Sequence, residues 1–130
     1  MAYLLDTNVA IELRDGDPAT TANVAALKGA VLMSVVTRVE LEGGVYREPA
    51  HAHAAVRRAR LDVMLQAIPA LAFDDHAADA YGKVVAGAGY WRRKLLDHMI
   101  AAHALVHRCT LVTRNPADFA GIAGLQLLTW

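Results

Sequence analysis

Short apolar runs alternate with helical stretches along the chain, and this alternation constrains the fold more than any other feature. Runs of buried-strand length occur at 3–5, 30–36, 70–73 and 109–113, and a last one lies near 125–130. Helices are expected from residue 9 to Gly16 and over 20–29, 37–47, 51–67, 76–89 and 95–108. Strands that alternate with helices are typical of a parallel sheet covered on both faces. We therefore predict an α/β fold of three layers, with a central, mostly parallel sheet of four to five strands flanked by helices.

The length and composition predict one soluble domain over residues 1–130. Hydrophobic residues make up 55% of the chain, but charged residues interrupt each apolar run before it reaches the roughly 18 residues of a membrane span. The first residues lack the basic start of a secretory signal peptide, and the single cysteine, Cys109, fits a reducing compartment. We expect a cytoplasmic protein with no membrane partner.

The balance of charge argues against a protein that coats nucleic acid by bulk electrostatics. Thirteen basic and thirteen acidic residues give no net charge, so any contact with nucleic acid must be local. Basic clusters occur at 57–60 and 90–94, and either one alone is simplest to interpret as a solvated surface. High hydrophobicity without net charge also indicates apolar surface that a partner covers.

Acidic residues fall where a parallel sheet would bind a ligand. In open α/β sheets, ligands bind beyond the carboxyl ends of the strands. Asp6 follows the first strand, Glu40 lies in the expected opening turn of the helix after the second, and Asp118 follows the fourth. Each has an ordinary alternative: Asp6 as a helix cap, Glu40 as part of the capping box "TRVE", and Asp118 as a turn residue.

A fourth acid, Asp97, lies on the long helix before the fourth strand and is harder to explain structurally. Small residues, Ala101 and Ala104, flank it on a helical wheel, and no basic residue lies within 95–106 to pair with it. A cation from outside the helix is the economical partner, and carboxylate oxygens suit hard ions such as Mg²⁺ or Mn²⁺. Four carboxylates could hold one or two such ions, which is the chemistry of a metal-dependent nuclease.

Histidines offer a second metal hypothesis. His103 and His107 stand at i and i+4, a spacing compatible with zinc, but the helical wheel turns both away from Asp97 and the metalloprotease glutamate is missing. Cys109, at the start of a buried strand, is expected to be a small core residue. The chain has no Gly-rich phosphate loop and no nucleophile elbow.

Four motifs in order, "LLDTNV", "SVVTRVELEGG", "LLDHMIAAHAL" and "LVTRNPADFAGIAGL", resemble the PIN-domain ribonucleases, in particular the VapC-type toxins of bacterial toxin/antitoxin pairs. The resemblance runs from residue 3 nearly to the end and implies a PIN-like fold. It places the family's acids at Asp6, Glu40 and Asp97, and the fourth at Asp118, with Asn115 as the alternative. The small polar residues that hold the acids in place are then Thr7, Asn8 and Thr113.

The resemblance also implies an activity and partners. It implies an endoribonuclease that depends on Mg²⁺ or Mn²⁺, forms a homodimer and is neutralised by a cognate antitoxin in a heterotetramer or larger assembly. Arg92, Arg93 and Lys94 then become candidates for gripping RNA phosphates, with Tyr90 or Trp91 available to stack a base.

Two other functions stay open. A phosphatase of the haloacid dehalogenase type would use Asp6 as a nucleophile, but it expects an aspartate where Asn8 stands, and the chain is short for its cap. A PIN-like module that binds RNA or protein without cleaving is the other.

Overall fold

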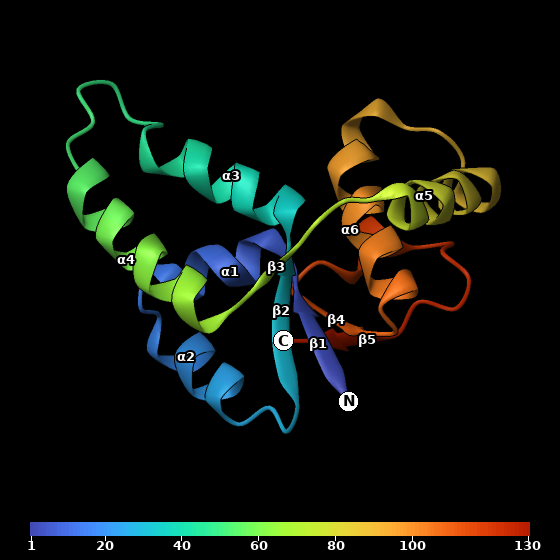
Figure 1. Cartoon of the computed structure of the whole chain (residues 1–130), viewed down its shortest axis with the longest axis horizontal. Helices are drawn as coiled ribbons and strands as arrows, with labels where there is room; N and C mark the ends of the chain where they lie inside the picture. Colours follow the sequence, from blue (N-terminus) through green and yellow to red (C-terminus); the bar gives the residue numbers. More distant parts are fainter.

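Five short strands form one parallel sheet at the centre of the computed structural model, which describes residues 1–130 (Figure 1). The strands are β1 (Ala2–Leu5), β2 (Ala30–Ser34), β3 (Ala70–Leu71), β4 (Thr110–Thr113) and β5 (Leu127–Thr129). They lie in the order β3-β2-β1-β4-β5, and every pair is parallel. The predicted α/β fold with a central parallel sheet is confirmed.

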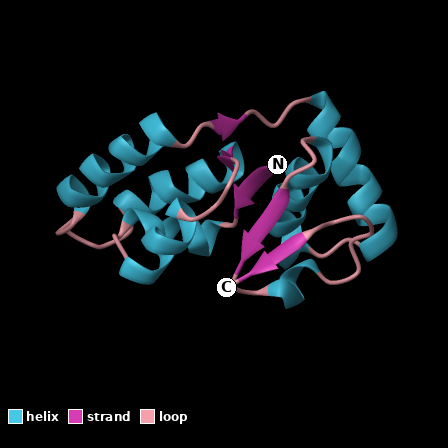
Figure 2. Ribbon diagram, turned by 90° about the horizontal axis from the view of Figure 1, so that it is seen from below, coloured by secondary structure: helices cyan, strands magenta, loops and turns pink.

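Helices cover the sheet on both faces. They are α1 (Thr7–Arg14), α2 (Pro18–Ala25), α3 (Val35–Val45), α4 (Ala54–Ala67), α5 (Asp75–Ala88) and α6 (Leu95–Val106), with short 3₁₀ turns η1 (Arg92–Lys94) and η2 (Pro116–Phe119). The first four helices lie on one side of the sheet, and α5 and α6 lie on the other (Figures 1 and 2). No helix has the length and apolar character needed to cross a bilayer.

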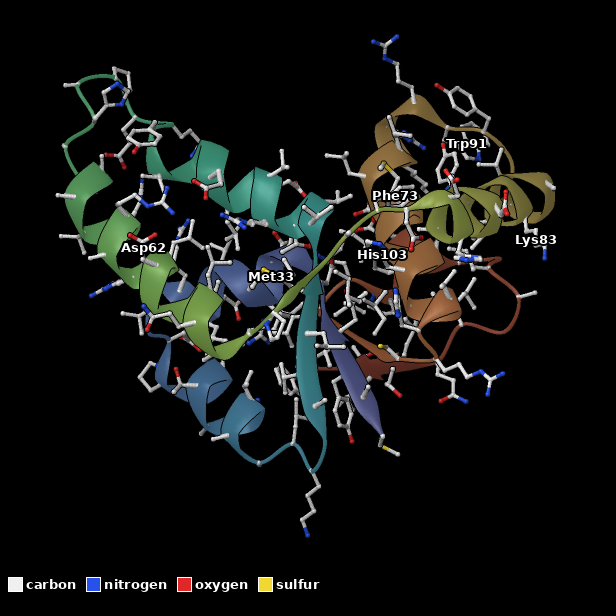
Figure 3. All side chains as sticks on the ribbon, viewed as in Figure 1. Met33, Asp62, Phe73, Lys83, Trp91 and His103 are labelled. Atoms are coloured by element: carbon white, nitrogen blue, oxygen red, sulfur yellow. The ribbon has the colours of Figure 1, made fainter.

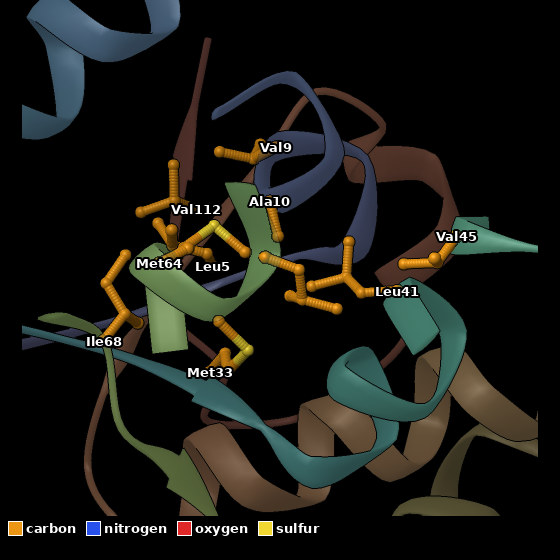
Figure 4. Packing of buried hydrophobic residues seen from close by; sticks show 10 residues of the cluster. Leu5, Val9, Ala10, Met33, Leu41, Val45, Met64, Ile68 and Val112 are labelled. Carbon is orange, nitrogen blue, oxygen red and sulfur yellow. The ribbon is translucent and has the colours of Figure 1, made fainter. Parts of the chain in front are cut away.

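The sheet divides the buried side chains into two clusters. Successive residues of a strand point to opposite faces, so Leu5 and Val112 join the cluster under α1, α3 and α4 (Figure 4), while Leu4 and Leu111 join the cluster under α6. Cys109 belongs to the second cluster as a free, buried thiol, as predicted. Both faces of β1 and β4 are thus fixed by packing.

The start of α3 differs from the prediction. β2 ends at Ser34, whose Oγ accepts a hydrogen bond from the Val36 amide (3.0 Å) and caps the helix, so α3 begins before Thr37. The interpretation of "TRVE" as a capping box is therefore wrong. Glu40 lies in the middle of α3, not in its opening turn.

The start of α1 confirms one of the ordinary alternatives. Asp6 is the N-cap of α1, because its Oδ1 accepts a hydrogen bond from the Thr7 amide (2.8 Å). The helix consequently begins at Thr7, two residues earlier than expected. Capping engages only part of this carboxylate, so it leaves room for a second role.

Candidate active site

One cavity of about 530 Å³ lies beyond the carboxyl ends of β1 and β4, and it collects acids from four elements. Asp6 comes from the end of β1, Glu40 from α3, Asp97 from α6 and Asp118 from η2. All four predicted acids line this cavity. The parallel pairing of β1 with β4 brings Asp6 and Asp118 to the same edge although they are far apart in the sequence.

Asp6 is the most tightly held of the acids. It is 5% exposed, and its Oδ2 accepts a hydrogen bond from Thr113 Oγ1 (2.8 Å). Thr113 Oγ1 in turn accepts a bond from the Asn115 amide (3.0 Å). Burial raises the pKa of Asp6, the hydrogen bonds from Thr113 and Thr7 lower it, and the nearby charge of Asp118 raises it further.

Thr7 links two of the acids. Its backbone amide donates to Asp6, and its hydroxyl donates to Glu40 Oε1 (2.7 Å). Because a hydroxyl has a single hydrogen, the Thr37 hydroxyl, 3.1 Å from Thr7 Oγ1, must be the donor in that second contact. The chain of bonds from Thr37 through Thr7 to Glu40 orients the glutamate.

Burial and the other three acids raise the pKa of Asp97. Its pKa is raised to about 6, first by burial and then by the negative charges of Asp6, Asp118 and Glu40, while Lys94 lowers it. Like charges this close disfavour one another's ionisation. The cavity is therefore a place where a positive charge is stabilised.

The acids share a cavity without a finished coordination geometry. No three His, Cys, Asp or Glu side chains are gathered tightly enough to hold an ion as they stand. The donor set itself, four carboxylates with no nitrogen or sulfur ligand, has the chemistry that hard divalent cations prefer.

Comparison with known proteins gives the family. The sequence pattern of the PIN domain family matches residues 3–125. The chain belongs to the PIN domain family. Ribonuclease VapC2 of Rickettsia felis is 26% identical over 137 residues, with 100% of this chain and 98% of the relative covered.

Solved structures confirm the resemblance noted in the motifs. VapBC2 from Rickettsia felis, bound to a DNA fragment from its promoter, aligns with a TM-score of 0.85 and 25% identity and covers 100% of this chain and 99% of that one. A toxin-antitoxin complex from Klebsiella pneumoniae aligns with a TM-score of 0.76 and 27% identity, covering 98% and 96%. The PIN-like, VapC-type resemblance is thus confirmed over the whole chain.

Among the supporting residues of this PIN domain, the structure separates Asp118 from Asn115. Asp118 lines the cavity, whereas Asn115 does not. The backbone amide of Asn115 donates a hydrogen bond to the Thr113 hydroxyl. Asn8 lines the cavity beside Thr7. Asp118 is therefore the fourth acid of this cavity, and its role as the fourth site residue stays a prediction.

The predicted RNA-gripping cations lie outside the cavity. Arg92, Arg93 and Lys94 form η1, directly before α6, and none of them lines the acidic cavity. Arg93 lies over the ring of Trp91 at 5.9 Å, and Lys94 acts on Asp97 only through its charge. Their role in gripping RNA stays a prediction.

Two arginines that the sequence reasoning missed line the cavity, Arg14 and Arg47. Helical spacing could have found them, since Arg14 lies seven residues after Thr7 and three after Ile11 and so shares their face of α1. Arg47 has the same seven-residue spacing from Glu40. The sequence gives the face, but not whether that face is buried.

The histidine pair does not form a zinc site. His103 is buried beside Phe73 (Figure 3), with Nδ1 2.8 Å from Ser34 Oγ and Nε2 3.0 Å from the Ala72 carbonyl. Burial lowers its pKa. Both nitrogens are thus engaged, and His103 ties α6 to the serine that caps α3.

Proposed function

We propose that this PIN domain is a metal-dependent endoribonuclease toxin that hydrolyses RNA phosphodiester bonds and is neutralised by a cognate antitoxin. The observation that carries the proposal is the single cavity lined by Asp6, Glu40, Asp97 and Asp118. It is supported by the match to a VapC ribonuclease over 100% of this chain and 98% of the relative.

The four acids are the residues that would hold Mg²⁺ or Mn²⁺. When bound, such an ion supplies positive charge that stabilises the developing charge on a phosphodiester and makes a water molecule more acidic. The mutual repulsion that raises the pKa of Asp97 would be relieved by that charge.

The chain's own contribution is to hold the acids in position. Thr113 and the Thr7 amide each fix one oxygen of Asp6, and the Thr7 hydroxyl fixes one oxygen of Glu40. Each carboxylate oxygen keeps a free lone pair after these bonds. Two of the four acids, Asp6 and Glu40, are therefore oriented on elements fixed by the packed sheet, which favours catalysis.

An apolar groove on the other side of α1 supports the proposed antitoxin. The groove measures about 670 Å³ and is lined mainly by apolar side chains of α1, α2 and α4, among them Leu13, Val24 and Val63. Val63 is 68% exposed and lies among the apolar side chains of this groove, and a contiguous apolar patch marks a surface that a partner covers. The Klebsiella pneumoniae relative was solved as a toxin-antitoxin complex.

The decisive experiment measures RNA cleavage by the purified protein with Mg²⁺, with Mn²⁺ and with a chelator. We expect cleavage with either ion and none with the chelator. Asp6→Asn should reduce the rate of RNA cleavage more than about 100-fold. This exceeds the roughly 10–100-fold loss that is usual when a residue that orients a metal ligand is removed. Asparagine still caps α1, so the helix should be kept.

Asp62→Asn is the matched control, since Asp62 lies on the exposed surface of α4 (Figure 3), forms an ion pair with Arg58 and does not line the cavity. In a bacterial host, expression should arrest growth with the wild type and with Asp62→Asn, but not with Asp6→Asn. Arrest that persists with Asp6→Asn would instead identify a module that acts by binding alone.

A further inference from the structure

The guanidinium of Arg14 is buried with one nitrogen unsatisfied. Its side chain is 3% exposed, and its Nε donates to Asp15 Oδ1 (3.1 Å). Nη1 has no hydrogen-bond partner and is the only buried side-chain nitrogen or oxygen in the protein of which this is true. A buried charged donor without a partner is costly, so an acceptor that arrives from outside is the natural explanation.

The unsatisfied nitrogen lies at the wall of the acidic cavity. Nη1 is next to Gly44 of α3, where a Cβ would stand only 3.2 Å from it. Both Arg14 and Gly44 line the acidic cavity. Glycine at position 44 therefore leaves space beside this buried donor that a side chain would fill.

Arg14 is separated from the catalytic acids along the helix axis. α1 starts beside Asp6 and runs away from the strand ends (Figure 1), so Arg14 lies about 10 Å along the axis from Thr7. None of the four cavity acids makes an ion pair with it, since its only carboxylate contact is with Asp15. The cavity thus has an acidic end and, with Arg14 and Arg47, a basic end.

We propose that Arg14 Nη1 donates a hydrogen bond to a non-bridging phosphate oxygen of the RNA strand, at a phosphate other than the one that is cut. A guanidinium matches phosphate geometry and stays charged when buried. Four acids on their own would repel a polyanion, and Arg14 supplies attraction without neutralising them. This inference rests on RNA being the substrate of the same cavity.

The test measures binding of a short, fluorescein-labelled single-stranded RNA over a series of salt concentrations, in an Asp6→Asn background that does not cleave. Arg14→Gln should weaken binding about tenfold and reduce the slope of log affinity against log salt by about 0.7, the value for one lost phosphate contact. Arg14→Lys should keep the slope and lose only part of the affinity. Lys83→Gln, an equal loss of charge on exposed α5 (Figure 3), should change neither.

A second pair of variants keeps the proposal testable if Arg14→Gln does not fold. Gly44→Ala and Gly82→Ala both place alanine in a helix, where alanine is favoured over glycine, and Gly82→Ala should raise the Tm. A Cβ at Gly82 meets nothing within 4 Å, whereas one at Gly44 presses on Arg14 Nη1. Only Gly44→Ala should weaken RNA binding, by a few-fold.

The outcomes separate this inference from the proposed function. In the cleaving protein, Arg14→Gln should raise KM with little change in kcat. A folded Arg14→Gln with the wild-type salt slope overturns the inference even if the wild type cleaves RNA, and so does a loss confined to binding of a protein partner. The expected slope change in a protein that never cleaves supports the inference and defeats only the catalytic proposal.

Discussion

Two hollows lie on either side of α1, and they have opposite chemistry. The acidic cavity has Ile11 as its only large apolar residue, whereas the groove against α2 and α4 is lined mostly by apolar side chains. Only Arg14 lines both. One helix of eight residues therefore separates a site suited to a metal and a polyanion from a surface suited to a protein. Changes on the two sides should have separable effects.

Among residues that do not themselves line either hollow or that line only one, apart from the acids, the largest effect is expected at Thr113, behind the acidic cavity. Thr113→Val removes the hydroxyl that donates to Asp6 Oδ2 and accepts from the Asn115 amide. We expect RNA cleavage to fall about 10–100-fold, the usual cost of losing a partner that orients a metal ligand. Binding of the antitoxin should not change.

Thr110→Val is the control, since Thr110 lies on the same strand and its side chain makes no hydrogen bond to the acids. Equal cleavage by Thr113→Val and wild type would show that Asp6 needs no such support.

A smaller effect is expected from the groove. Val63→Glu places a charge in the groove at a position that is already exposed. The free energy of unfolding should therefore change little, and the rate of RNA cleavage should stay within about twofold of wild type. Affinity for the cognate antitoxin should fall about tenfold, because an unpaired charge is desolvated on binding. Calorimetric titration of the purified pair measures it.

Val56→Glu is the matched substitution outside the groove, on the same helix and at 52% exposure. If both variants bind the antitoxin equally well, the groove is not the antitoxin surface.

The smallest effect concerns Asp97 in the acidic cavity and the pH dependence of the free energy of unfolding. The pKa of Asp97 is raised to about 6, so the folded protein holds its proton more tightly than the unfolded chain does. Stability is therefore lost as the pH rises from about 4 through 6. Asp97→Asn should be more stable than wild type at pH 7 by roughly 1 kcal/mol, given that water reaches this half-buried side chain.

Urea unfolding with a chelator present, at pH 4, 5.5 and 7, measures this difference. The gap between Asp97→Asn and wild type should close towards pH 4, where both side chains are neutral. A gap that is constant across the range would assign the effect to packing and not to charge.

Three of the four acids of the cavity were predictable because two local signals sufficed, whereas Glu40 was expected in the opening turn of α3 and lies in its middle. Asp6 and Asp118 follow strands, and strand ends meet at one edge of a parallel sheet. Asp97 was indicated by a missing counter-charge. In both cases, the neighbouring residues along the chain carried the information.

Contacts between distant elements were not predictable in this way. Ser34 and Thr37 both fit a helix cap, and the choice is consistent with Thr37 contacting Thr7 and with His103 binding Ser34. An arginine at a helix end also fits a solvated surface equally well, so only the packing of α1 against α3 and Gly44 shows that Arg14 is buried. Tertiary contact decided each case.

The two outermost strands of the sheet are also its shortest, β3 with two residues and β5 with three. The unpaired backbone groups of an exposed edge strand can form hydrogen bonds with another chain, and a longer edge strand offers more of them. Pairing of two copies through the edges of β3 and β5 would therefore form few backbone hydrogen bonds. The helices on the two faces of the sheet offer more surface for contact with another chain than these strand edges do.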